Sequence, residues 1–327
     1  MTILFTKIAT IASLLLASTS ISCARGENVV KAVYTSDDSG VKDFPAYSSK
    51  LVSSYMPLPA FTSISSYHNS NIVFVQTDGE YSLRATGHID DPLRHLDIKV
   101  ENGVLQISRR EAEGGVVRNS GVTRFIDQFI TIYISGKQLE GINMSGTADF
   151  FCEKIYQQTP FNAIMRGTGD VNVIDLSVNQ LTVNLHGTGD FKSKNTNAPD
   201  CRLNLMGTGD IDIDNLVSSY ISAILSGTGD FKLPSILTSD ITAVLSGIGD
   251  MKLGGKCTDS ASFSVPGMGD LRAKKLTAER VTATVTGTGS LECTPISNIN
   301  ATRTNGDLTY FGSPKTVKTS GNVRNSK

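Results

Sequence analysis

The sequence contains no tryptophan, and aromatic residues make up only 7% of its 327 residues. The absence of tryptophan argues against a surface on which sugar rings stack. Lysine and arginine number 30 against 31 aspartate and glutamate residues, so the net charge is −1, and no basic cluster offsets this balance. A chain without a positive field has no means of steering a polyanion, and we therefore expect no nucleic-acid binding.

Motifs for catalysis or metal binding are also scarce. The chain has four histidines, and no two of them lie at metal-ligand spacing. Local motifs supply neither a Ser-His-Asp set nor a glycine-rich phosphate loop. The apolar run from Ile8 to Ala17 is too short to span a membrane as a helix.

The main feature of the chain is a glycine-centred turn that recurs through residues 146–307. The spacing between turn glycines is 21 residues once and 20 residues six times, and a degenerate ninth copy is Asn305-Gly306-Asp307. A fixed period of this kind indicates a solenoid with one coil per repeat. The turn glycines are Gly146, Gly167, Gly187, Gly207, Gly227, Gly247, Gly267 and Gly287.

Each repeat alternates apolar and polar residues on both sides of the turn. In the third repeat Leu185 precedes the turn glycine by two positions and Phe191 follows it by four, and every repeat is apolar at both positions. Period-two alternation is typical of a strand with one buried face. Because a 20-residue unit cannot bury that face alone, the units must stack. The sequence predicts an all-β fold, a right-handed parallel β-helix of about eight coils.

The corners carry a second glycine two residues after the first, as in Gly187-Thr188-Gly189-Asp190. We expect this second glycine to adopt a positive φ, so that Gly209→Val destabilises the fold. The first repeat has Ala148 at this position and the 21-residue spacing. We therefore expect a distorted first corner.

Residues 58–135 are strand-like but lack the Gly-x-Gly-Asp corner. We expect strands at 61–66, 71–76, 81–85, 96–100, 104–108 and 129–134. An open end of a β-helix invites association between edges, so this irregular N-terminal β region is expected to cap the solenoid. The repeat β-helix then covers residues 136–311, and 312–327 form a polar C-terminal cap or tail.

Residues 1–22 have the pattern of a signal peptide, with Lys7, an apolar run and small residues before Cys23. The segment resembles a bacterial lipobox, although Ser20 stands where an apolar residue is usual. We expect Cys23 to carry lipid such as palmitate and residues 23–57 to form a lipid-anchored tether. The protein would then be an exported outer-membrane lipoprotein, facing the periplasm or the cell surface. A signal peptide that is cleaved without lipidation is the alternative.

One aspartate closes the corner of each of seven repeats, from Asp149 to Asp270. We expect each carboxylate to accept hydrogen bonds from amides of its own corner. The alternative is a weak calcium site, with Asp190, Asp210 and Asp230 as candidate ligands.

Basic residues follow several of these aspartates by two positions, and polysaccharide lyases with a β-helix fold also combine acidic calcium ligands with a basic residue. A catalytic site, however, needs a local exception to the repeat. We therefore expect no catalytic residue and no cofactor. The basic residues are Lys192, Lys232, Lys252 and Arg272.

The sequence also leads to expectations for an outward apolar pair and for the cysteines. Ile224 and Val244 are outward-facing apolar residues on adjacent coils, and they are a candidate contact surface. Ordinary β propensity is the alternative explanation. The four cysteines beyond Cys23 occupy no two adjacent coils, so we expect four free, buried thiols. They are Cys152, Cys201, Cys257 and Cys293.

Several of these segments together resemble the head GIN domain of putative auto-transporter adhesins over residues 58–322. They are the Ser/Thr-Gly-Thr-Gly-Asp corners, Phe61-Thr-Ser-Ile64, Ile72-Val-Phe-Val-Gln76 and Tyr310-Phe-Gly-Ser-Pro314. The resemblance implies an exported bacterial β-helix, often a lipoprotein, without established catalytic residues or ligand.

We therefore expect a non-enzymatic binding or adhesion module. Its partner would be a protein or glycan of the cell envelope or host surface, or a second copy of the chain. The alternatives are a polysaccharide-active enzyme and a passive envelope scaffold.

Overall fold

The computed structural model of the chain describes residues 47–89, 91–110 and 130–326. The expected signal peptide, Cys23 and most of the expected tether lie outside the described residues. Strands dominate the described part, and its one helical element is a 3-10 turn, η1 (Pro92–His95). No helix within these ranges is long and apolar enough to cross a membrane.

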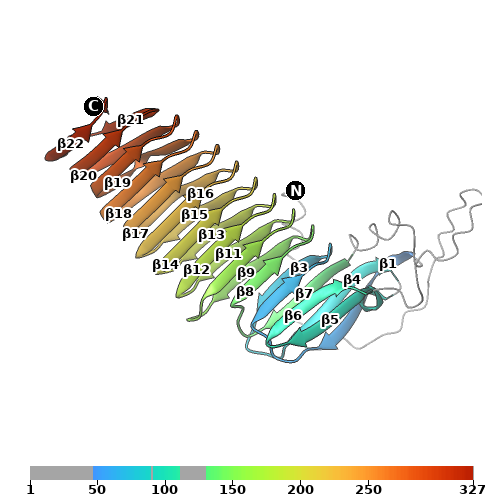
Figure 1. The fold of residues 1–327 in the computed structure, drawn as a ribbon. Coiled ribbons are helices and arrows are strands. Elements are labelled where there is room, and N and C mark those ends of the chain that lie inside the picture. Colours follow the sequence, from blue (N-terminus) through green and yellow to red (C-terminus); the bar gives the residue numbers. More distant parts are fainter. Residues whose placement is uncertain (1–46, 90, 111–129, 327) are drawn as a thin grey trace, which may run out of the picture.

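The repeats form a rod made of two parallel sheets, which we call sheet I and sheet II (Figure 1). Each coil supplies one strand to each sheet. Sheet I contains β9 (Phe150–Tyr156), β11 (Val171–Ser177), β13 (Phe191–Asn197) and β15 (Ile211–Val217). Sheet II contains β8 (Gly141–Met144), β10 (Phe161–Met165), β12 (Gln180–Leu185), β14 (Asp200–Leu205) and β16 (Tyr220–Leu225).

Later strands bend and run through both sheets in one piece. They are β17 (Phe231–Leu245), β18 (Met251–Val265), β19 (Asp270–Val285) and β20 (Ser290–Arg303). Parallel pairing continues from each of these strands to the next. The expected solenoid is therefore confirmed.

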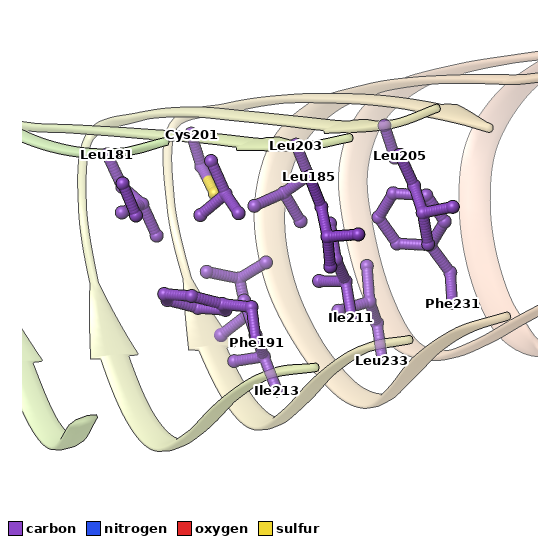
Figure 2. Packing of buried hydrophobic residues seen from close by; sticks show 14 of the residues in the cluster. Leu181, Leu185, Phe191, Cys201, Leu203, Leu205, Ile211, Ile213, Phe231 and Leu233 are labelled. Atoms are coloured by element: carbon purple, nitrogen blue, oxygen red, sulfur yellow. The ribbon is translucent and has the colours of Figure 1, made fainter. Parts of the chain in front are cut away.

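The register between coils follows the repeat, so that Val171 pairs with Phe191 and Leu185 with Leu205. Equivalent apolar side chains consequently stack in columns between the two sheets, where Figure 2 shows Leu181, Cys201 and Phe191 pointing inward. Stacking of like residues along the rod buries the face that one coil cannot bury alone. One fully buried column consists of Phe150, Val171, Phe191, Ile211, Phe231, Met251, Leu271 and Leu291.

The C-terminal residues complete a last coil. In sheet I, β21 (Asp307–Phe311) pairs with β20, and β23 (Arg324–Ser326) pairs with β21. In sheet II, β22 (Thr316–Ser320) pairs with β20. Residues 312–326, expected to be a cap or tail, thus continue the stack, and β22 and β23 are its edge strands.

Both sheets continue beyond the first repeat at the N-terminal end. Sheet I adds β3 (Asn71–Gln76), β7 (Ile130–Gly136), β4 (Ser82–Ile89) and β1 (Tyr47–Pro57), in that order outward. Sheet II adds β2 (Ser63–Ser66), β6 (Val104–Arg109) and β5 (Leu96–Glu101).

We call β1, β4 to β7 and η1 the cap. Its outer pairs, β7 with β4, β4 with β1 and β6 with β5, are antiparallel. All six strands expected within residues 58–135 are present, as β2 to β7. The end of the segment expected as a tether forms the additional strand β1.

One regular coil lies between the cap and the first repeat, although it precedes most of the cap in sequence. It consists of β2, a corner at residues 67–70, and β3. In this coil β2 pairs with β8 and β3 with β9, in the same parallel manner as the repeats. The cap strands β6 and β7 cover its other side.

The reason for the second corner glycine differs from our expectation. Among the described glycines, positive φ occurs only at Gly103, Gly255, Gly306, Gly312 and Gly321, so the predicted positive φ of Gly209 is wrong. A Cβ on Gly209 would instead lie 2.1 Å from the carbonyl oxygen of Gly189 on the adjacent coil. Glycine is required because two backbones approach closely.

The first corner also differs from the expected picture. Phe150 to Phe161 spans 11 residues, whereas the paired segment from Val171 to Leu181 spans 10. The additional residue therefore lies within 157–160, at the corner opposite Ala148. The stacking at the Ala148 corner is undisturbed, because the Asp170 amide donates to Asp149 Oδ1 at 2.9 Å, as in later coils.

Free, buried thiols are confirmed for all four cysteines that the structure describes. Their side chains take the place of small apolar residues in the stacked columns, and Cys201 pairs between Leu181 and Ile221. Burial raises the pKa of both Cys152 and Cys293 to about 12. The thiols therefore act as core residues.

Candidate binding surface

The corner aspartates form a continuous hydrogen-bonded ladder along one edge of the rod. The Oδ1 atom of each accepts a hydrogen bond from the backbone amide of the aspartate on the next coil. Asp190 Oδ1, for example, accepts from the Asp210 amide at 2.8 Å, and Asp210 Oδ1 accepts from the Asp230 amide at 2.8 Å. Our expectation that each carboxylate binds its own corner is therefore wrong. The ladder joins neighbouring coils.

The ladder is longer than the sequence pattern suggested. At its start Asn71 Oδ1 accepts from the Asp149 amide at 3.0 Å, so the β2–β3 coil supplies the first rung. At its end Ser290 donates through its amide and its hydroxyl to Asp270 Oδ1, at 3.2 and 2.7 Å. Asn71 escaped detection because its rung partner follows 78 residues later, far from the 20-residue period.

Basic side chains pair with the second carboxylate oxygen of several rungs. Lys192 Nζ lies 2.7 Å from Asp190 Oδ2, and Lys232 Nζ lies 2.8 Å from Asp210 Oδ2. The guanidinium of Arg272 bridges two rungs, Asp250 and Asp270. Cations alternating along the rungs offset the repulsion that stacked carboxylates would otherwise have, about 1 kcal/mol per pair in water.

The pKa values of the rungs depend on whether a cation is close. Burial alone would raise the pKa of Asp210, but the Lys232 ammonium and the Asp230 amide outweigh it and hold the pKa below the ordinary value. For Asp149, burial and the charge of Asp170 together raise the pKa above the ordinary value. The ladder is therefore electrostatically strong in its middle and weak where it meets the β2–β3 coil.

The candidate calcium ligands are occupied by these structural contacts. Asp190 and Asp210 each have one oxygen on an amide and the other on a lysine. Asp230 Oδ1 accepts from the Asp250 amide at 2.9 Å. Within the described ranges, no three His, Cys, Asp or Glu side chains are grouped so that they could hold a metal ion.

The two sheets present different outer surfaces. The column of sheet I that lies beside the ladder is strongly charged, with Lys192 next to Asp212 and Lys232 next to Lys252. Between residues 172 and 292 it contains Asn172, Lys192, Asp212, Lys232, Lys252, Arg272 and Glu292.

Sheet II has two central outward columns, and Arg202 is their one charged residue between residues 162 and 302, beyond which Lys318 of β22 continues the first column. We call these the sheet II columns. The first contains Asn162, Thr182, Arg202, Ser222, Thr242, Ser262, Thr282 and Asn300, and the second contains Ile164, Asn184, Asn204, Ile224, Val244, Ser264, Thr284 and Thr302.

The structure brings together the two residues proposed as a contact surface. Ile224 and Val244 pair directly on neighbouring coils of sheet II. Ile224 is 38% exposed, and Val244 is half-buried beside it. On one side the pair continues into Asn204, whose side-chain Nδ2 donates to Asn184 Oδ1 at 2.9 Å.

Tyr220 adds an aromatic ring to the same strand and was not foreseen. It begins β16 and is 41% exposed. No periodic pattern predicted it, because the equivalent positions on the neighbouring coils hold Asp200 and Asp240. Tyr220, Ile224 and Val244 therefore form the candidate contact surface, which combines an aromatic ring with β-branched side chains.

Comparison with known proteins supports this assignment of fold. A sequence model of the family described as "putative auto-transporter adhesin, head GIN domain" matches residues 60–243 and 202–314. A search of curated proteins finds no similar protein.

Two crystal structures of proteins named putative adhesins resemble the chain. The crystal structure of a "putative adhesin" from Bacteroides fragilis has a TM-score of 0.50 and 19% identity, over 85% of this chain and 98% of that chain. A "putative adhesin" from Parabacteroides distasonis has a TM-score of 0.48 and 18% identity, over 85% and 97%. At this level of identity the likeness concerns the fold alone.

Proposed function

Because the chain belongs to the family of putative auto-transporter adhesin head GIN domains, we propose that its solenoid is a non-enzymatic adhesion module that binds through sheet II. The observation that carries the proposal is the low charge of the sheet II columns. A surface with few charges can be desolvated at low cost when a partner covers it. Exposed Ile224, half-buried Val244 and the exposed ring of Tyr220 supply apolar surface that such a contact would bury.

The stacked architecture suits this role. Solenoids commonly bind partners over extended surfaces that many repeats build together. Each sheet II strand within the repeats pairs in parallel with the strands of the coils on both sides, as β16 pairs with β14 and β17. A partner therefore meets a preorganised surface and does not have to order it on binding.

The acidic ladder supports a structural role for the carboxylates. Each Oδ1 accepts from an amide of the next coil, and Lys192 and Lys232, two of the basic residues considered as proton acceptors, are paired with rungs. A general base needs a carboxylate or amine that is available to the substrate. The ladder instead uses these groups to fasten coils together.

The family description suggests an exported protein that acts at the cell surface. We propose that a lipid on Cys23 anchors it in the envelope, in agreement with the signal-like segment before that residue. Cys23→Ala should abolish fatty-acid labelling and membrane partitioning. Unchanged labelling would contradict the anchor and leave the adhesion proposal intact.

The main test measures binding of the purified chain to cells, to envelope fractions and to itself. Ile224→Lys with Val244→Lys should weaken binding by at least about tenfold, because two charges must then be desolvated in the contact. Asn195→Lys with Asn215→Lys is the matched control. It adds the same charge on adjacent coils of sheet I.

Three outcomes would contradict the proposal. Equal loss in both double variants would show that added charge, and not its position, weakens binding. Binding to none of the targets would favour a passive scaffold. Release of reducing or unsaturated sugar ends from a polysaccharide, lost in Asp210→Asn, would favour an enzyme.

A further inference from the structure

A surface hollow of about 310 Å³ opens at the capped end of the rod. It lies where β1, η1 and β5 meet, so its walls come from the outermost strand of each sheet and from the turn between them. The adhesion surface proposed above lies on sheet II within the repeats. The hollow is therefore a separate feature, and an inference about it goes beyond that function.

The floor of the hollow is apolar. Leu96 at its base is fully buried in the core. Met56, Leu93 and Ile98 pack against the same core but are only half-buried. At this end the hydrophobic interior of the solenoid thus reaches the surface, and an apolar ligand that covered it would gain burial energy.

The rim of the hollow carries positive charge. Arg94 and Arg110 are exposed, and neither forms an ion pair with a residue that the structure describes. The acidic residue of the lining, Asp91, is held in the wall, where its Oδ1 atom accepts from the Ser54 hydroxyl at 2.9 Å and from the Leu93 amide at 3.2 Å. The two guanidinium groups are thus the charged groups at the rim that keep their hydrogen-bond donors available.

We propose that this hollow binds an anionic amphiphile. Its apolar chain would lie on Met56, Leu93 and Ile98, and its carboxylate or phosphate would lie between Arg94 and Arg110. The planar donor fork of arginine matches both anions in geometry. The volume is at the lower end of the range for ligand sites, which suits one acyl chain. The apolar floor offers no hydrogen bonds to a sugar.

Titration of the full chain carrying Cys23→Ala tests the proposal with three probes that share one chain length. They are oleate, oleyl alcohol and oleylamine, each measured by displacement of a fluorescent fatty acid. We expect oleate to bind at least about tenfold more tightly than the alcohol, the difference that one hydrogen bond to a charged group makes. Oleylamine should bind most weakly, because the rim would repel it.

Variants then assign the binding to the hollow. Arg94→Glu with Arg110→Glu should weaken oleate binding about 100-fold and leave the alcohol nearly unchanged. Ile98→Asp should weaken both probes. The control is Lys256→Glu with Lys318→Glu, which makes the same charge change at exposed lysines elsewhere and should have no effect. Circular dichroism verifies that each variant folds.

Vesicles distinguish a free amphiphile from a lipid in a bilayer. Binding to phosphatidylglycerol vesicles but not to phosphatidylcholine vesicles, lost in the double glutamate variant, would place the anionic group on a membrane lipid. Binding to oleate alone would identify a free amphiphile, and either result supports the proposal. It would be overturned by equal affinity for the three probes, by an unaffected double glutamate variant, or by no binding in either assay.

Discussion

The repeat stack and the cap share both sheets, but different kinds of contact hold them together. In the stack the same contact recurs on every coil, as the Asp190 and Asp210 rungs show. In the cap each contact occurs once. The Arg84 guanidinium lies 4.9 Å from the centre of the Tyr133 ring. At the border between the cap and the β2–β3 coil, Phe61 meets Tyr81 edge to face at 5.2 Å.

This difference determines how each region responds to change. In a repeat stack, a coil that loses its fit affects the coils on both sides, because stability comes from the interfaces between neighbours. In the cap a lost contact is local, and side chains can adjust around it. We therefore expect the stack to be rigid and intolerant of substitution and the cap to be more adaptable.

The largest expected effect is the protection of the stack's cysteines. In the chain carrying Cys23→Ala, we expect native thiols to react at least about 1,000-fold more slowly than denatured ones, since reaction requires coils to separate. Burial also raises the pKa of Cys152 and Cys293 to about 12, which keeps the reactive thiolate rare. An absorbance assay with a disulfide reagent gives both rates.

The same assay counts the thiols. Denatured protein without reductant should show four, because the described cysteines are free. A count of two or none would contradict the coil register, and a thiol that reacts rapidly in the native state would contradict the rigidity of the stack. The described cap contains no cysteine, so the labelling rate reports on the stack alone.

The next effect compares two glycine substitutions. Gly209→Ala should destabilise by more than about 2 kcal/mol, because its Cβ would meet a backbone carbonyl at 2.1 Å. In the cap, Gly136→Ala should cost about 1 kcal/mol or less. Its Cβ would meet aromatic side-chain atoms of Phe61, Phe74 and Tyr81 at 3.3 Å, and these can shift.

Urea denaturation measures both changes in the free energy of unfolding. Thr208→Val is the control for the corner, because this exposed neighbour alters the same turn without a close backbone contact. Equal losses for Gly209→Ala and Gly136→Ala would show that cap and stack tolerate substitution alike.

The sequence predicted most of the stack and the strands of the cap. Period-two alternation located the inward side chains, and the 20-residue spacing set the register, which Phe191 and Phe231 confirm in one buried column. In the coil next to the cap, the expected strand at 71–76 agrees with β3 at both ends. Local patterns are sufficient where the contact recurs at a fixed distance along the chain.

Other features depended on contacts that no local pattern specifies. A glycine in the sequence does not reveal whether it is required for positive φ or for close approach, so Gly209 was explained wrongly. A repeated aspartate does not reveal whether it binds its own corner or that of the next coil, because the two corners have nearly the same sequence. The hollow escaped prediction because Met56, Leu93 and Ile98 come from three separate elements.

A smaller effect separates two rungs of the ladder. Asp210→Asn should lower stability at neutral pH by about 0.5 to 1 kcal/mol, the range for partly exposed pairs, because it removes the ion pair with Lys232. The amide hydrogen bond survives, as Asn71 shows on its own rung. Asp149→Asn should leave stability equal or higher, because the ionised form of Asp149 is disfavoured.

The pH dependence of thermal unfolding has opposite signs for the two rungs. Because the folded pKa of Asp210 is lowered, its contribution is present at neutral pH and disappears as the pH falls through that pKa. Because the folded pKa of Asp149 is raised, its ionised carboxylate destabilises the fold at neutral pH, and this destabilisation disappears on acidification. Parallel pH profiles for both variants would contradict these assignments.

The smallest expected effect concerns the pair of Arg84 and Tyr133 in the cap. Arg84→Met keeps the apolar stem and removes the cation over the ring, which costs about 0.5 to 1 kcal/mol. Part of this cost is offset, because Arg84 Nε is buried without a hydrogen-bond partner among the described residues. Tyr133→Leu in the methionine background should then lose less stability than in the wild type. If cap and stack open separately, thiol labelling stays at the wild-type rate in Arg84→Met, whereas faster labelling would show that the two regions unfold as one unit.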